Sequence, residues 1–193
     1  MASTTDKTMR ADARRNREKL LDAAAALFAA EGTDVSLEAV AKRAGVGIGT
    51  LYRHFPTRDA LIADAYRNEV AHVADGVDEL LTSLPPDAAM EEWLDRFVAY
   101  AAAKRGMSEA LKSLSAAREE LFADTRRRLL AAIETLLAAG VKAGTIRPDV
   151  HAGDVLRALG AVWAIPDDDG WVDQARTLVR LLMDGLRFGA RPS

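Results

Sequence analysis

The sequence predicts an all-α fold of about nine helices. Apolar residues return at three- and four-residue intervals in almost every segment, which is the period of an amphipathic helix. The apolar runs end at Gly or Pro, and no segment has the pattern of a strand. The chain has 193 residues, of which 49% are hydrophobic, so it can bury a core in one large or two small domains.

Residues 1–57 are predicted to form a domain with three helices. The apolar positions of the first helix are Leu20, Leu21, Ala24, Leu27 and Phe28. Gly32 follows this helix, as expected just past a C-terminus, and Ser36 is a suitable N-cap for a short second helix. The turn AGV separates the second helix from a third, which must end before Pro56.

The glycines of AGVGIGTLYRHF, residues 44–55, do not form a phosphate-binding loop. A dinucleotide fingerprint needs Gly where Thr50 stands, and a Walker A loop needs a Gly-Lys-Ser/Thr ending that is missing here. On a helical wheel, the apolar face of the third helix consists of Ile48, Leu51, Tyr52 and Phe55. The opposite face consists of Gly49, Thr50, Arg53 and His54.

The second and third helices can therefore cross as a helix-turn-helix, with Gly45 in the left-handed conformation of the turn. In a recognition helix that enters the DNA major groove, the N-terminal residues approach the base edges. The small residues Gly47 and Gly49 would let the backbone come close, and Arg53 has the donors to bind guanine O6 and N7.

The run LEAVAKRAGVGIGTLYRHFPTRDAL resembles the DNA-binding domain of TetR-family transcriptional regulators, whose pattern is roughly I-A-x-x-A-G-V-S-x-G-T-L-Y-x-H-F-x-x-K-x-x-L. The resemblance covers about the first third of the chain. It departs at Gly47, where the family often has Ser, and at Arg58, where it often has Lys. The resemblance implies phosphate contacts by Tyr52 and Arg58. The expected DNA-binding residues are Ser36, Gly47, Gly49, Thr50, Tyr52, Arg53, His54 and Arg58.

Charge is unevenly distributed along the chain. The formal net charge is −3, yet residues 1–60 carry ten basic and eight acidic residues, a net charge of +2, and the remainder sums to −5. Four arginines near the N-terminus form a basic segment: Arg10, Arg14, Arg15 and Arg17. This segment either reaches an adjacent minor groove or is a solvated tail.

Residues 58–193 are predicted to form a second helical domain. Thr57 caps a helix from Arg58 to Ser83, which Pro85 ends. The next helix is expected to end near Gly106, a short one to include Leu111 and Leu114, and a long one to run from Phe122 to about Gly140. Two final helices, separated by IPDDDG, are expected to carry Val155 to Trp163 and Val172 to Leu186.

The resemblance implies that this second domain binds a small-molecule effector, at least partly apolar, and forms a homodimer. Pocket candidates, each also compatible with plain core, are Trp93, Phe97, Tyr100, Met107, Leu111, Leu114, Phe122 and Trp163. The candidate dimer interface lies on the last two helices and contains Leu159, Val162, Leu178, Leu182 and Leu186. The expected function is a ligand-responsive regulator, most often a repressor, that binds double-stranded palindromic operator DNA as a homodimer.

Composition argues against other classes of protein. The chain has no cysteine, and its three histidines lie too far apart for a metal motif, so we expect no metal and no cofactor. Without a nucleophile motif, enzymatic activity is not expected. No segment resembles a signal peptide or membrane span, so the protein is expected in the cytoplasm. The alternative is a helical small-molecule-binding or enzymatic protein that keeps the helix-turn-helix as structure only.

Overall fold

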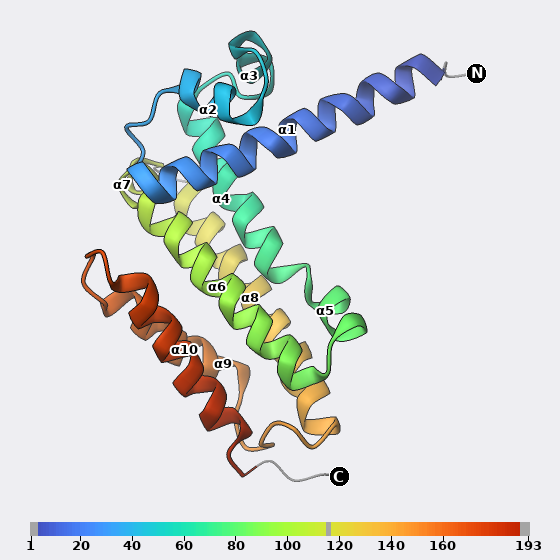
Figure 1. Cartoon of the computed structure of the whole chain (residues 1–193), viewed down its shortest axis with the longest axis vertical. Coiled ribbons are helices and arrows are strands. Elements are labelled where there is room, and N and C mark those ends of the chain that lie inside the picture. The colour runs from blue at the N-terminus through green and yellow to red at the C-terminus, as the bar shows by residue number, and fades with distance from the viewer. Residues whose placement is uncertain (1–3, 115–116, 190–193) are drawn as a thin grey trace. The chain divides into compact units, whose positions relative to one another are not determined.

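The all-α prediction is confirmed in the computed structural model, which describes residues 4–114 and 117–189. Within these residues there is no strand. The helices, shown in Figure 1, are α1 (Thr4–Glu31), α2 (Leu37–Ala44), α3 (Ile48–His54), α4 (Arg58–Ala74), α5 (Val77–Ser83), α6 (Pro86–Gly106), α7 (Ser108–Ser113), α8 (Ala117–Lys142), α9 (Ala152–Leu159), the 3₁₀ helix η1 (Gly160–Ala164) and α10 (Trp171–Arg187).

The chain forms two compact units. The first unit comprises Met1–Glu69 and Ala103–Arg118, and the second comprises Val70–Ala102 and Glu119–Ser193. Helices α4 and α6 therefore each pass from one unit into the other. The domain boundary that the sequence predicts, between residues 57 and 58, is not tested by this division into compact units and stays a prediction.

The first unit is built around α1, which packs against α2 and α3 (Figure 1). Leu20, Ala24 and Phe28 of α1 are completely buried, as the helical period predicts. Gly32 follows α1 with a φ of +74°, a conformation that Gly adopts without a Cβ clash. In the second unit, Pro86 is the first residue of α6, a position where the missing N–H of proline costs no hydrogen bond.

The predicted continuous helix from Arg58 to Ser83 is wrong, because the chain breaks between α4 and α5. Glycine is disfavoured in helix interiors, and Gly76 lies at the break with Asp78 and Glu79 placed in the first turn that follows. Asp75 turns away to pair with Arg128 of α8 at 2.6 Å. This break raises the number of α-helices in the described residues from the expected nine to ten.

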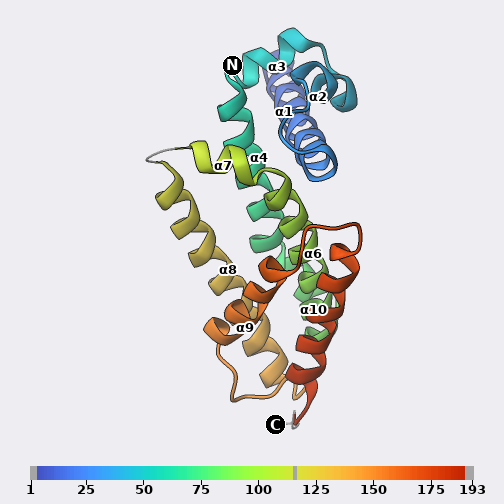
Figure 2. The ribbon, with the colours of Figure 1, turned by 90° about the vertical axis from the view of Figure 1, so that its left-hand side faces the viewer.

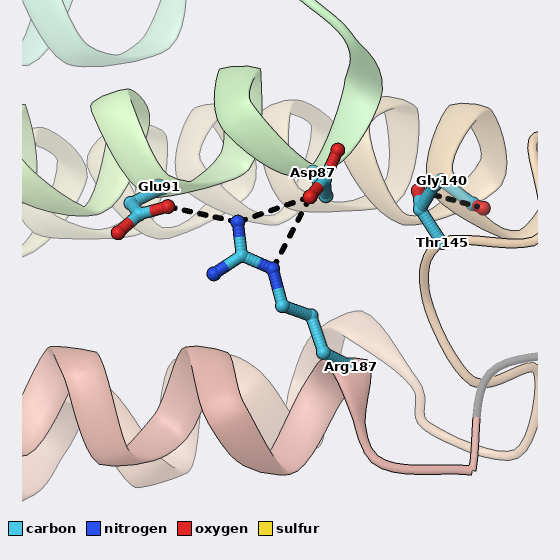
Figure 3. Close-up of polar contacts among 5 residues, drawn as sticks. All are labelled: Asp87, Glu91, Gly140, Thr145 and Arg187. Carbon is cyan, nitrogen blue, oxygen red and sulfur yellow. Dashed lines mark hydrogen bonds and ion pairs between the residues drawn. The ribbon is translucent and has the colours of Figure 1, made fainter.

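In the second unit, α9 and α10 lie beside α8 and α6 (Figure 2). Arg187 joins α10 to α6, because its Nη2 lies 3.0 Å from Asp87 and 2.8 Å from Glu91, both on α6 (Figure 3). The hydrogen bonds to Glu91 and Asp87 raise the pKa of the Arg187 guanidinium. The contact between α6 and α10 therefore includes two salt bridges, which lie near the C-terminus of α10.

The last helices follow the prediction with one difference. The segment with Val162 and Trp163 continues α9 as a 3₁₀ helix rather than an α-helix. The acidic loop IPDDDG precedes α10, since Asp168 Oδ1 accepts the Gly170 N–H at 2.9 Å and α10 begins at Trp171. Residues 144–150, GTIRPDV, lie in the connection between α8 and α9, with Gly144 at a φ of +68°.

Candidate nucleic-acid interface

Helices α2 and α3 form the predicted helix-turn-helix. The Ser36 Oγ accepts the backbone N–H of Ala39 at 3.1 Å, which confirms Ser36 as the N-cap of α2. Gly45 ends α2 with a φ of +70° and a ψ of +31°, the left-handed conformation expected at this turn. The Val46 N–H then bonds to the Ala41 carbonyl at 3.0 Å and closes the turn. The sequence thus encodes both ends of the turn locally.

One face of α3 is buried and the other is open to solvent. Leu51 and Phe55 are 0% and 1% exposed, as predicted for the apolar face. The predicted apolar face is too wide, however, because Ile48 is 36% exposed and Tyr52 is 48% exposed. Ile48 stands at the first position of α3, where the helix has just left the turn. Both side chains therefore belong with the open face.

Of the polar residues predicted to contact DNA, those that belong to α3 lie on this open face or at its edge. Arg53 Nη2 donates to Thr50 Oγ1 at 3.0 Å, so these two side chains are already joined one turn apart. His54 is half-buried and its ring centroid lies 6.2 Å from that of Phe55. Arg53 and Tyr52 are exposed, and they offer guanidinium N–H groups and a phenol O–H to a partner.

Gly47 and Gly49 are not required by the packing of the protein itself. Apart from the adjoining residues and the backbone of the same helix, no atom of the described residues lies within 4 Å of a Cβ built at either position. Neither has a positive φ, in contrast to Gly45, so backbone strain does not demand glycine there. The absence of a side chain at both positions would instead let a binding partner come close to the backbone of the protein.

Arg58 is bound to the protein. Its Nη2 donates to the Val35 carbonyl at 2.7 Å, which links the first turn of α4 to the loop before α2. The side chain is half-buried. A guanidinium has five donor hydrogens, so this bond leaves donors for the phosphate contact that the resemblance implies. That contact stays a prediction.

The basic segment near the N-terminus lies within α1, which begins at Thr4. The N-terminal part of this helix extends beyond α2 and α3 (Figure 1). Arg14 pairs with Glu18 at 3.7 Å, and Arg15 pairs with Asp12 of the same helix. Arg17 instead reaches Asp64 of α4 at 2.6 Å. The side chain of Arg10 lies outside the described residues. The four arginines therefore do not form one equivalent set.

The predicted pocket residues are distributed over both units. Trp93, Phe97 and Tyr100 of α6 are almost completely buried and stack in sequence, with ring centroids 6.0 and 5.6 Å apart. Trp163, 38% exposed, meets Tyr100 edge-on at 6.4 Å, and Phe122 is half-buried. The first unit holds the remaining three, with Met107 and Leu111 buried and Leu114 half-buried just after α7.

Two hollows of the second unit have other linings. One, of about 380 Å³, lies between the α4–α5 break and α8 and includes Asp75, Val77, Arg128 and Ala132. The other, of about 260 Å³, lies between α6 and α10 and includes Leu94, Asp95, Val179 and Arg180. None of the predicted pocket residues lines either hollow, and the predicted pocket stays a prediction.

The predicted dimer residues divide into two groups. Leu159, Val162 and Leu186 are 2% exposed or less within one protomer. Leu178 and Leu182 of α10 are half-buried, and Leu181 between them, which the sequence reasoning missed, is 63% exposed. Burial against one's own protomer and burial against a partner give the same apolar spacing in sequence, so periodicity could not separate them.

A helix-turn-helix whose second helix, here α3, has a solvent-exposed face is typical of DNA-binding proteins. Comparison with known proteins agrees: the family described as bacterial regulatory proteins, tetR family, matches residues 20–65, and a transcriptional regulator SbtR-like C-terminal domain matches residues 85–188. The chain belongs to the TetR family of transcriptional regulators. Members of this family are DNA-binding regulators and not enzymes, so the enzymatic alternative is set aside.

Solved structures of the same family are similar over most of the chain. A TetR transcriptional regulator from Streptomyces coelicolor is 44% identical, covers 89% of this chain and 98% of its own, and superimposes with a TM-score of 0.82. A TetR protein from Mycobacterium vanbaalenii is 37% identical, covers 93% and 99%, and has a TM-score of 0.75.

Curated relatives match a shorter stretch. An HTH-type transcriptional regulator of Staphylococcus aureus is 44% identical over 54 residues, which is 28% of this chain. The match spans only 29% of that relative's length. Across the part of the chain that the structure describes, no helix is both long and apolar enough to cross a bilayer.

Proposed function

We propose that the protein is a homodimeric, ligand-responsive repressor that binds a palindromic operator and leaves it when a small molecule binds. The observation that carries the DNA-binding part is the open face of α3, where Gly47 and Gly49 have no packing reason to be glycine. Close approach of the α3 backbone to the base edges of DNA would explain why both positions are glycine. A regulator of this kind acts in the cytoplasm, where a bacterial chromosome lies.

Two-fold symmetry sets the geometry of the operator. Two copies of α3 meet successive major grooves on one side of the duplex when they are about 34 to 36 Å apart, or a multiple of that distance. A symmetric dimer therefore reads two inverted half-sites. In each half-site, exposed Ile48 supplies an apolar contact for a thymine methyl group, and Arg53 supplies donors for guanine.

The exposed face of α10 and η1 supports dimer formation. Leu181 is 63% exposed and Trp163 is 38% exposed, and large apolar side chains in this state are candidates for burial by a second copy. Leu181→Asp should convert the dimer to a monomer, because a dimer would bury the carboxylate without a partner. Light scattering at micromolar concentration measures this change. Arg180→Asp, on the adjacent exposed position, is the matched control and should remain dimeric.

The release mechanism we propose acts through α4, which passes from the first unit into the second. A ligand that binds one dimer shape better than another shifts the population toward that shape and so changes the separation of the two α3 helices. The buried aromatic run of α6 and the hollow beside the α4–α5 break both support a mostly apolar effector with a polar group.

Selection of genomic DNA fragments by the purified protein at physiological salt, followed by sequencing, tests the proposed function. Enrichment of a palindrome is the expected result. Recovery of no enriched sequence, together with no salt-sensitive affinity for DNA, would favour a helical small-molecule-binding protein that keeps the helix-turn-helix as structure only.

Arg53 and Arg58 should differ in how their loss affects DNA binding. Arg58→Ala is expected to weaken binding to all sequences and to reduce the slope of log affinity against log salt by about one, because one phosphate contact is lost. Arg53→Ala is expected to lower affinity for the operator by about 1 to 3 kcal/mol and to spare non-specific binding, because it reads a base. Fluorescence anisotropy with operator and scrambled duplexes at several salt concentrations measures both quantities.

The controls for this pair lie on the same unit. Arg43→Ala removes an exposed positive charge from α2 and serves as the control for net charge. If Arg53→Ala weakens operator and scrambled duplex equally, Arg53 does not read a base. If Arg58→Ala leaves the salt slope unchanged, the bond to Val35 is the main role of Arg58.

A further inference from the structure

Among the arginines of α1 whose side chains the structure describes, Arg17 is the one that pairs with another helix. Arg14 and Arg15 pair with residues of α1, and their side chains are 76% and 64% exposed. Arg17 is 43% exposed and places Nη2 2.6 Å from Asp64 Oδ2 on α4. The Arg17 guanidinium is thus anchored to another helix of the protein, whereas those of Arg14 and Arg15 pair within α1.

The carboxylate of Asp64 is shared between two helices. Its Oδ2 accepts from Arg17 of α1, and its Oδ1 accepts from Arg67 Nη1 of α4 at 2.7 Å. One turn further along, Asn68 Nδ2 donates to Asp22 Oδ1 at 3.0 Å, which joins the same two helices again. The α1–α4 contact is thus fixed by hydrogen bonds at two successive turns.

Arg17 also touches the end of the recognition helix. Its guanidinium carbon lies 5.4 Å from the ring centroid of Phe55, within the range of a cation–π contact. Phe55 is 1% exposed, directly follows α3, and donates its N–H to the Leu51 carbonyl at 2.8 Å. A displacement of this ring would therefore move the last turn of α3.

We propose that Arg17 is a positioning residue for DNA readout, which holds α1 and the end of α3 against α4 and does not itself bind DNA. Binding residues must be held within about 0.5 Å of their productive geometry for full effect. Through Asp64 and Phe55, Arg17 sets where α3 stands on α4, the helix along which we propose that the effector signal travels.

Asp64→Asn gives the sharpest test because two views of the site predict opposite results. Removing a negative charge from a DNA-binding unit should tighten DNA binding if only net electrostatics matters. If Asp64 holds Arg17 in place, the same change should weaken operator binding by about tenfold, the size expected for loss of a part-buried charged contact. The probe is the duplex that the wild-type protein enriches, followed by fluorescence anisotropy.

The salt dependence of Arg17→Ala separates positioning from phosphate contact. A positioning role predicts about tenfold weaker binding with an unchanged slope of log affinity against log salt, whereas loss of one phosphate contact lowers the slope by about 0.9. Arg14→Ala removes the same charge from the same helix and is the matched control, with a smaller loss of affinity expected. In the Asp64→Asn background, Arg17→Ala should cost less affinity than it does in the wild-type protein.

Each of these measurements has a result that contradicts a positioning role for Arg17. Tighter binding by Asp64→Asn, a slope lowered by about 0.9 in Arg17→Ala, or equal losses in Arg14→Ala and Arg17→Ala would each overturn the inference. Thermal unfolding checks that each variant is folded, and Asp64→Asn, nearly isosteric, carries the test if Arg17→Ala is not. The inference rests on the proposed function: absence of salt-sensitive binding by the wild type would overturn that function, whereas wild-type binding with unaffected variants would overturn this inference alone.

Discussion

Gly106→Ala should lower the free energy of unfolding by about 3 kcal/mol, at the upper end of the usual cost of overpacking. Gly106 is the last residue of α6, and a Cβ built there would lie 1.9 Å from the Phe28 carbonyl oxygen and 2.9 Å from the Ala29 Cα. These neighbours are backbone atoms of α1, so no side-chain rotation can relieve the clash. The two helices of the first unit must separate to admit one methyl group.

Urea unfolding followed by circular dichroism, at one fixed protein concentration, measures this loss. Gly153→Ala is the matched control, because the nearest atom to a Cβ at that position of α9 is Arg157 Nη2 at 3.8 Å. That change should be neutral or stabilising by up to about 1 kcal/mol, since Ala favours the helix. If both variants unfold at the same urea concentration, the close approach of α6 to α1 does not contribute to stability.

The importance of Gly106 was not predictable from the sequence. A glycine near the end of a helix indicates a C-cap, and the pattern could not reveal that another helix crosses there. The caps at Ser36 and Gly45, in contrast, were predicted correctly, because each depends on atoms within a few residues of itself. Local chemistry can be predicted from sequence, whereas contacts between distant segments cannot.

The candidate site shows the same division. The open face of α3 could be predicted from spacing and from the resemblance to known regulators, apart from Ile48, whose exposure depends on how α3 sits on α1 and α2. Arg17 appeared only as one basic residue among four, because its partner Asp64 lies 47 residues away. The pairing of Arg58 with Val35 was missed for the same reason.

The break in the predicted helix over 58–83 exposes a carbonyl that a buried tryptophan satisfies. The last carbonyls of a helix have no intrahelical donor, and the Val73 carbonyl belongs to this group because α4 ends at Ala74. Trp93 of α6, completely buried, donates its indole Nε1–H to this oxygen at 2.7 Å. The sequence reasoning placed Trp93 in a pocket, since nothing in its own neighbourhood indicated that α4 would end beside it.

Trp93→Ala should therefore be among the most destabilising substitutions, with a loss of about 4 kcal/mol from the cavity and the lost hydrogen bond. Trp93→Phe isolates the hydrogen bond when it is compared with Phe97→Leu, because both changes remove the same number of heavy atoms from buried positions one turn apart on α6. Trp93→Phe should cost about 2 kcal/mol more, since it alone leaves a buried carbonyl without a donor. Equal midpoints in urea would mean that water or a shift of α4 satisfies the Val73 carbonyl, and that the end of α4 does not depend on Trp93.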